Sequence, residues 1–172
     1  MTSAPLRLIL DTNVVLDLLH FADAPALPIL SSLEAGDAQC YASAETLDEL
    51  RRVLTYAAFK LDEKTQLALH ARYQAISGLE KSLSVCGHMP RCSDQDDQMF
   101  LELAASTQAD LLVSKDKALL ALKRHPGLTF KIVTPVEACA LLSGVRHAES
   151  PTPCAPTLSL LSPHPAHRSS FQ

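Results

Sequence analysis

The sequence predicts an α/β protein, a three-layer α/β/α sandwich around a central, mainly parallel sheet of five strands. Short apolar runs of strand length alternate with segments of helical spacing along most of the 172 residues. Such alternation is typical of strands joined by crossover helices that cover both faces of a parallel sheet. After residue 144 no period is sustained, and proline, serine and histidine become frequent. We therefore expect one folded domain over 1–144 and a disordered tail over 145–172.

The expected strands are mainly apolar runs bounded by polar or turn-forming residues. The first ends abruptly in Asp-Thr-Asn, and the third is followed by a loop that contains glycine and proline. Runs of this length are typical of strands buried on both faces of a sheet. In order along the chain, the five runs cover 6–10, 39–42, 82–86, 111–114 and 130–133.

The helices expected between these strands carry apolar residues three or four positions apart. Ser43 and Asp62 are placed to cap two of them. Two more begin with capping-box patterns, Ser93-Asp94-Gln95-Asp96 and Thr134-Pro135-Val136-Glu137. In order along the chain, the helices cover about 13–20, 25–34, 44–54, 63–77, 94–104, 115–123 and 135–143.

The composition excludes several functional classes. The formal net charge of −4 argues against a protein that holds nucleic acid mainly by a basic surface. It leaves open an enzyme that meets phosphates through bound divalent cations. No apolar run approaches the roughly 20 residues of a membrane helix, and the amino-terminal residues pass directly into a strand rather than a signal peptide. We expect a protein that acts in the cytoplasm without a membrane partner.

Acidic side chains gather at the expected carboxyl edge of the sheet, where open parallel sheets bind ligands. Asp11 ends the first strand, and Asp116 follows the fourth. Asp97 lies in the first turn or so of a helix, and Glu49 lies two turns into the helix after the second strand. Clustered carboxylates raise one another's pKa unless cations neutralise them. Oxygen ligands favour Mg²⁺ or Mn²⁺, and such a cluster suits two-metal phosphoryl chemistry.

Three of these acids also have a simpler explanation. Asp11 could cap the helix that follows it, and Glu49 could be a solvated charge on a helix surface. Asp97 could do no more than interact favourably with the helix dipole. If Glu49 or Asp97 is not the residue that faces the cluster, the alternates in the same segments are Glu45, Asp94 and Asp96.

Two segments in the first half of the chain resemble motifs of the PIN-domain ribonucleases. Asp11-Thr12-Asn13, placed directly after an apolar strand, is similar to the opening motif of that family. Glu45-Thr46-Leu47-Asp48-Glu49-Leu50 is similar to its second motif, with Glu49 at the acidic position before the leucine. The resemblance extends over roughly residues 6–142 and is closest to the bacterial branch that contains toxins of toxin–antitoxin pairs.

Two segments in the second half continue the resemblance in the family's order. Asp94-Gln95-Asp96-Asp97 is similar to the third motif. Asp97 aligns with its metal-binding acid, because Ala104 then fits the small helix residue seven positions later. Val113-Ser114-Lys115-Asp116 is similar to the fourth motif, with Ser114 in place of the usual threonine.

The resemblance implies a PIN-like endoribonuclease that depends on Mg²⁺ or Mn²⁺ and leaves 5′-phosphate and 3′-hydroxyl products. It also implies the toxin of a type II toxin–antitoxin pair, with RNA as substrate, a cognate antitoxin as partner and a homodimer as assembly. The residues expected to hold one or two ions are Asp11, Glu49, Asp97 and Asp116. Those expected to position the acids are Thr12, Asn13 and Ser114, and the candidates for contacts with RNA phosphates are Lys115, Lys117 and Arg52.

Two other functions stay open at this point. Gln95 stands where the family usually has proline, and Ala118 stands where an auxiliary acid is common. With the negative net charge, the missing acid leaves room for a PIN-like module that binds RNA or a protein without cutting. A phosphatase of the haloacid dehalogenase type would use Asp11 as nucleophile. That family needs a second aspartate two residues later, where this chain has Asn13.

Overall fold

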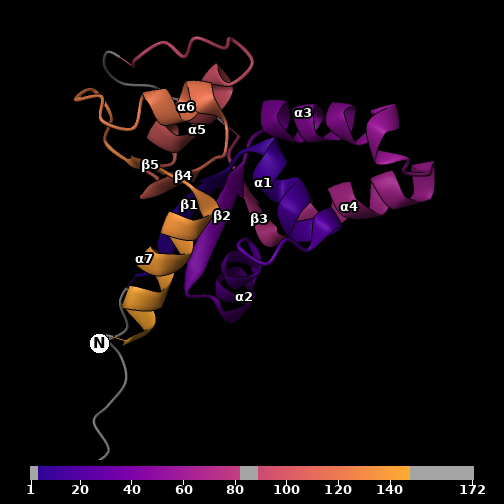
Figure 1. The fold of residues 1–172 in the computed structure, drawn as a ribbon, viewed down its shortest axis with the longest axis horizontal. Helices are drawn as coiled ribbons and strands as arrows, with labels where there is room; N and C mark the ends of the chain where they lie inside the picture. Colours follow the sequence, from indigo (N-terminus) through magenta and orange to yellow (C-terminus); the bar gives the residue numbers. More distant parts are fainter. Residues whose placement is uncertain (1–3, 82–88, 148–172) are drawn as a thin grey trace, which may run out of the picture.

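The structure is a computed structural model that describes residues 4–81 and 89–147. Its centre is a five-stranded sheet with the order β3-β2-β1-β4-β5 (Figure 1). Every neighbouring pair of strands is parallel, so the carboxyl ends of all strands lie at one edge. The predicted α/β fold with a five-stranded parallel sheet is confirmed. The strands are β1 (Leu6–Leu10), β2 (Ala38–Ala42), β3 (Ser77–Leu79), β4 (Leu111–Val113) and β5 (Lys131–Val133).

Helices cover both faces of this sheet. They are α1 (Thr12–Leu16) with its continuation η1 (Asp17–Phe21), α2 (Leu27–Ala35), α3 (Ala44–Leu54), η2 (Ala57–Phe59), α4 (Glu63–Ile76), α5 (Gln98–Ser106), α6 (Lys117–Ala121) and α7 (Pro135–His147). Leu8 and Leu10 of β1 pack in the core with α1, α2, α3 and α7. Ile9, between them, packs in a second core with α5 and α6. This alternation along one strand produces the three layers.

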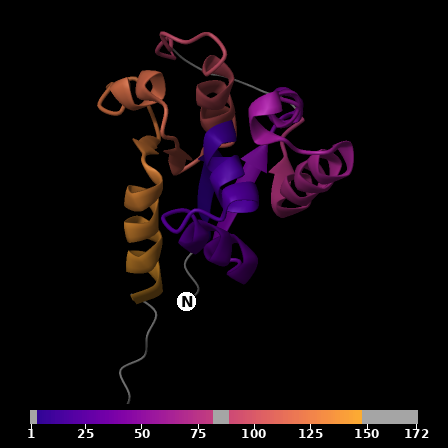
Figure 2. The same cartoon turned by 45° about the vertical axis from the view of Figure 1, so that its right-hand side comes forward.

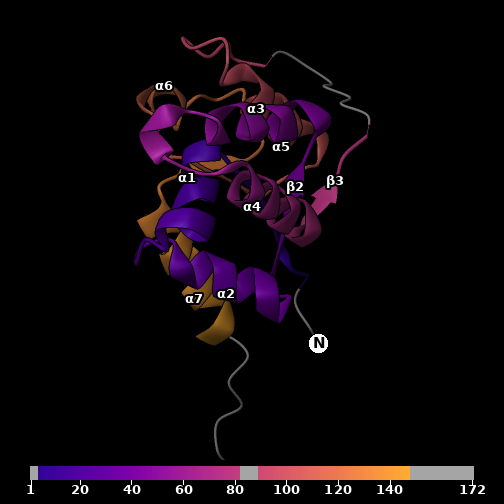
Figure 3. The same cartoon turned by 90° about the vertical axis from the view of Figure 1, so that its right-hand side faces the viewer.

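Two groups of helices lie over opposite ends of the strand order. The helix α7 contacts β4, β5 and α2, whereas α4 contacts β3 and α3. Figure 2 shows α7 well separated from the α3–α4 pair, and Figure 3 shows α3 and α4 side by side. The helix α3 also contacts α1 and α5, so it borders the carboxyl edge of the sheet from which both of those helices start.

The third strand of the sheet lies earlier in the chain than the sequence predicts. It is Ser77–Leu79, directly after α4, and it pairs with β2. The run at 82–86 that was expected to form it lies outside the described residues. The strand has only three residues and includes Gly78, so it carries no apolar run to detect. A Cβ at Gly78 would lie 3.1 Å from the ring of Tyr41, so the two strands approach closely there.

The start of α5 also differs from the prediction. The capping box at residues 93–96 predicts a helix from that point, but α5 begins at Gln98. Asp94 caps a turn instead, because its Oδ1 accepts the backbone N–H of Asp96 at 3.0 Å. The side chain of Gln98 accepts the N–H of Cys92 at 2.8 Å and keeps this loop folded back on the helix.

Three other predicted helix starts are confirmed. Ser43 accepts the N–H of Thr46 at 3.3 Å, and the Thr46 hydroxyl accepts the N–H of Ser43 at 2.9 Å. Asp62 caps α4. At α7, the side chains and backbone N–H groups of Thr134 and Glu137 bond reciprocally. The helix itself continues to His147, past the expected end near residue 143.

Candidate active site

The carboxyl edge of the sheet carries two acids at the ends of neighbouring strands. Asp11 follows β1 directly, and its backbone N–H donates to the carbonyl oxygen of Val113 in β4 at 3.1 Å. Asp116 comes shortly after β4 and is the N-cap residue of α6. Because β1 and β4 are parallel neighbours, both acids lie at the same end of the sheet. This is the placement that the sequence predicts for them.

Asp11 is a buried carboxylate, with only 3% of its surface exposed. Its Oδ1 accepts the N–H of Val14 at 2.9 Å, so Asp11 is also the N-cap of α1. Its Oδ2 accepts the hydroxyl of Ser114. Burial raises the pKa of Asp11, and the bonds from Ser114, Val14 and the backbone N–H groups of Lys115 and Asn13 oppose that rise. With several donors on one carboxylate, its position is defined by the fold.

Ser114 joins the two strand-end acids through one hydroxyl. The side chain is fully buried. It donates to the Asp11 carboxylate, and its oxygen accepts the backbone N–H of Asp116 at 2.9 Å. The other two residues named as supports behave differently. Thr12 is buried, but its hydroxyl has no hydrogen-bond partner in the described part of the chain, and the exposed Asn13 contributes only its backbone N–H.

Asp97 approaches the same edge from the start of α5, where it is the N-cap residue. Burial, the charge of Asp116 and a hydrogen bond between the two carboxyl groups raise the pKa of Asp97 to about 7. The charges of Asp94 and Asp11 add to this rise. Two adjacent carboxyls cannot both ionise easily, so this pair retains a proton near neutral pH. The Oδ2 atom of Asp97 is buried and has no hydrogen-bond partner among residues 4–81 and 89–147.

Glu49 is held against a cation of its own helix. Its Oε2 accepts a hydrogen bond from the Nε–H of Arg52 at 2.9 Å, and Nη2 of the same guanidinium contacts the same oxygen. That Nη2 also lies 3.7 Å from Oδ2 of Asp96. The Glu49 side chain is 17% exposed and that of Arg52 is 54% exposed, so the acid is the more enclosed partner. The guanidinium therefore links α3 to the loop that precedes α5.

An ion pair that the sequence did not predict stands beside these acids. Lys115, named as a candidate for phosphate contacts, pairs instead with Asp17, whose side chain is only 9% exposed. Asp17 begins η1, three positions after the buried Val14 and one before the buried Leu18. An acid on the apolar face of a helix was the available signal, because such a group needs a partner when buried.

The alternate acids lie on more exposed parts of the same segments. Asp94 and Asp96 belong to the exposed loop before α5, although the charge of Asp94 is felt by Asp97. Glu45 is exposed in the first turn of α3, where its own backbone N–H and the Ser43 hydroxyl lower its pKa. The Glu45 carboxylate thus serves the helix start.

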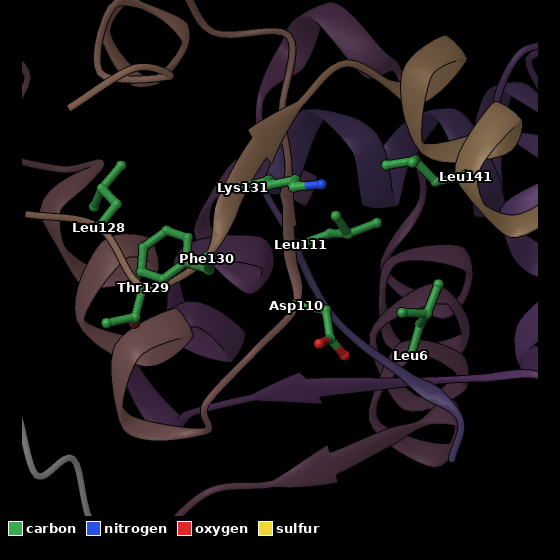
Figure 4. A pocket seen from close by; sticks show the side chains of 8 residues that line it. All are labelled: Leu6, Asp110, Leu111, Leu128, Thr129, Phe130, Lys131 and Leu141. Atoms are coloured by element: carbon green, nitrogen blue, oxygen red, sulfur yellow. The ribbon is translucent and has the colours of Figure 1, made fainter. Parts of the chain in front are cut away.

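Two hollows of the surface lie at opposite ends of the strands. An open depression at the carboxyl edge is lined by Ser93, Asp94, Gln95, Asp116, Lys117, Ala118 and Ala121. A more enclosed, mainly apolar pocket of about 480 Å³ at the amino edge is shown in Figure 4; it is lined by Leu6, Asp110, Leu111, Leu128, Thr129, Phe130, Lys131 and Leu141. In that pocket Asp110 accepts the backbone N–H of Arg7 at 2.8 Å. Of the acids predicted to form the site, Asp116 lines the open depression at the carboxyl edge.

The donor set at this edge fits a hard divalent cation through two carboxylates rather than through a closed cage. Within residues 4–81 and 89–147, no three Asp, Glu, His or Cys side chains converge closely enough to hold a metal ion by themselves. Mg²⁺ is usually bound by one or two carboxylates and keeps several waters. The Asp97–Asp116 pair, with the unpartnered Oδ2 of Asp97, supplies such ligands. Convergence of all four predicted acids stays a prediction.

The fold and this acid-lined edge define an α/β protein with a candidate active site at the ends of parallel strands. A family model described as PIN domain matches residues 7–118, and the chain belongs to the PIN-domain family. The members of this family are generally nucleases. Because the chain belongs to this family, it is not assigned to the haloacid dehalogenase type of phosphatase.

A solved structure shares the fold. The chain is similar to one in the crystal structure of VapBC2 from Rickettsia felis bound to a DNA fragment from their promoter. The TM-score is 0.52 at 15% sequence identity, and the match covers 74% of this chain and 98% of that one. No curated protein matches the sequence. In the described part of the chain, no helix has the length and apolar character required to cross a membrane.

Proposed function

We propose that this protein is a metal-dependent endoribonuclease that hydrolyses RNA phosphodiester bonds. The observation that carries the proposal is the Asp97–Asp116 pair. The Asp116 carboxyl is close enough to raise the pKa of Asp97, the charge of Asp11 adds to this rise, and Asp116 lines the open depression at the carboxyl edge of the sheet. Such a pair favours exchange of its proton for a divalent cation. Membership in the PIN family makes nucleic acid hydrolysis the chemistry to expect from that cation.

In this proposal Asp97 and Asp116 bind Mg²⁺ or Mn²⁺, and Glu49 contributes when its carboxylate turns from Arg52. Asp11 acts from behind them, since its charge lies nearby and its carboxylate holds the Ser114 hydroxyl that positions Asp116. A divalent cation held by these residues would act as a Lewis acid, with the chemistry to activate water and to neutralise charge on the scissile phosphate. Lys117, exposed beside Asp116, is placed to meet the RNA backbone.

We further propose that the protein is the toxin of a type II pair and acts in the cytoplasm as a homodimer. One chain of the VapBC2 structure, which is bound to a DNA fragment from their promoter, shares this fold and supports the proposal. A cognate antitoxin would be expected to bring basic side chains to the acidic edge, because unneutralised carboxylates attract them. A search for an adjacent small gene that encodes a DNA-binding protein tests the pairing.

The test of the activity compares two acids at the two ends of β4. Asp116→Asn should abolish Mn²⁺-dependent cleavage of single-stranded RNA, while Asp110→Asn, at the amino end, should retain it. Both variants should fold, because asparagine keeps an acceptor oxygen for the bonds that each aspartate makes to backbone N–H groups. Cleavage by Asp116→Asn at the wild-type rate would refute the assignment.

One observation favours a second candidate, a PIN-like module that binds RNA or protein without cutting. No preformed group of three ligands exists among the described residues, and Ala118 supplies no auxiliary acid. Calorimetric titration with Mn²⁺ separates the candidates. Heat of binding that is lost in Asp97→Asn supports the nuclease, and the absence of heat in the wild-type protein supports the binding module.

A further inference from the structure

Arg52 is set apart from the other cations near the acidic edge by the acid that it binds. Its Nε and Nη2 both contact Oε2 of Glu49, which is one of the proposed metal ligands. The same guanidinium is 3.7 Å from Asp96, at the loop that leads into Asp97. The positive charge of Arg52 therefore already neutralises Glu49, the same acid that a divalent cation would bind.

The neighbouring pair on α3 provides an internal comparison. Arg51 contacts Asp48 at 2.8 Å with the same spacing of three residues along the helix. Both of those side chains are 68% exposed, as expected for a solvated surface pair. Glu49, in contrast, is 17% exposed, and its partner Arg52 lies 3.7 Å from Asp96 in the loop before α5. One helix thus carries two equivalent pairs, and only one of them includes an enclosed acid.

The Arg52 side chain is open to solvent, as is that of Lys115, which pairs with the enclosed Asp17. The Arg52 side chain is 54% exposed, so solvent screens its charge and lowers the cost of its release from Glu49. A divalent cation can therefore displace it from Glu49. Once released beside the acidic edge, a guanidinium offers forked N–H donors that match the geometry of a phosphate.

We propose that Arg52 is a resident counter-ion of Glu49 that the divalent cation displaces, and that the displaced guanidinium then binds the RNA phosphate next to the scissile bond. This inference rests on the proposed nuclease function. It assigns Arg52 two successive partners, an acid in the metal-free protein and a phosphate in the complex with metal and RNA. Metal loading and substrate binding are coupled by that exchange.

The test uses Arg52→Gln, with Arg51→Gln as the matched control. Mn²⁺ is titrated calorimetrically into protein freed of metal with EDTA, and cleavage of RNA is then measured at saturating Mn²⁺. Arg52→Gln should bind Mn²⁺ about two- to fivefold more tightly, because the competing charge is gone. It should cleave RNA about tenfold more slowly, because a charged contact with the phosphate is lost. Arg51→Gln should match the wild-type protein in both measurements.

The two effects have opposite signs, which a merely structural role of Arg52 would not produce. Arg52→Lys keeps the positive charge without the fork, so its Mn²⁺ affinity should stay near wild type while its cleavage stays slow. Unchanged or weaker Mn²⁺ binding in Arg52→Gln would overturn the inference, and so would unchanged cleavage. If the wild-type protein binds no Mn²⁺, the proposed function fails and this inference fails with it.

Discussion

The acids of the sheet edge and the acid of α3 are held in different ways. Asp11 is fixed by backbone N–H groups at the start of its own helix and by the buried hydroxyl of Ser114, which the parallel pairing of β1 and β4 brings to it. Glu49 is fixed by Arg52, a side chain three residues away on the same helix surface. The first arrangement is part of the fold. The second is a contact between two side chains and can be exchanged without disturbing any strand. The strand ends thus supply an acid in a fixed position, and α3 supplies an acid that can change partners.

The largest expected effect comes from removing one charge from each region. Asp11→Asn should reduce Mn²⁺-dependent cleavage by about a thousandfold, because the loss affects both the charge beside the metal pair and the placement of Ser114. Glu49→Gln should reduce it by about tenfold to a hundredfold, since this ligand joins only after release from Arg52. Rates at saturating Mn²⁺ measure both. Equal losses would contradict the distinction between the fixed acid Asp11 and the exchangeable acid Glu49.

A smaller effect is expected at the hydroxyl that joins the strand ends. Ser114→Ala leaves an oxygen of buried Asp11 and the N–H of Asp116 without their shared partner. The free energy of unfolding should fall by about 1–3 kcal/mol, and Mn²⁺ affinity should fall by about tenfold to a hundredfold. Urea denaturation and calorimetry provide the two values. Ser114→Thr keeps the hydroxyl and serves as the control; full retention of Mn²⁺ affinity in Ser114→Ala would contradict its role.

The smallest effect is the pH dependence of stability in the metal-free protein. Asp97 has a pKa of about 7 in the folded state against an ordinary value of 3.8. Between these values the folded protein keeps a proton that the unfolded chain has lost. The resulting stability is fully present below pH 3.8 and is lost as the pH rises through 7.

The melting temperature measured in EDTA should therefore decline less steeply from pH 5 to pH 7 in Asp97→Asn than in the wild-type protein. Mn²⁺ added at pH 8 should raise the melting temperature of the wild-type protein, because binding to the folded state stabilises it. Identical slopes in Asp97→Asn and wild type would show that the proton resides elsewhere.

The strand-end acids could be predicted from the sequence because they obey a rule of topology. In a parallel sheet, a residue that ends one strand meets the residue that ends its neighbour, so Asp11 and Asp116 needed only two apolar runs to be placed. Ser43 and Asp62 were predictable for a similar reason, since capping depends on local spacing. These features require no knowledge of side-chain direction.

Other features depend on contacts that the linear pattern does not contain. β3 consists of three residues that are recognisable as a strand by their pairing with β2. The missing side chain of Gly78 matters because the ring of Tyr41, on the neighbouring strand, lies close to it. The partner of Asp17 is Lys115, which is distant in sequence. The Glu49–Arg52 pair lies at helical spacing and was within reach of a sequence rule. What could not be predicted was that Glu49 would be enclosed and Asp48 exposed.

The hydrogen bond between Ser114 and Asp11 joins residues 103 positions apart. A ribosome that synthesises this chain therefore makes Asp11 long before its partners exist. Parallel pairing over such a separation is slow to form, because the intervening loop must close first. Chains that end before β4 lack Asp116 and the hydroxyl that aligns it. The arrangement of the two strand-end acids can therefore form only after β4 has been synthesised, and any activity that depends on it begins no earlier.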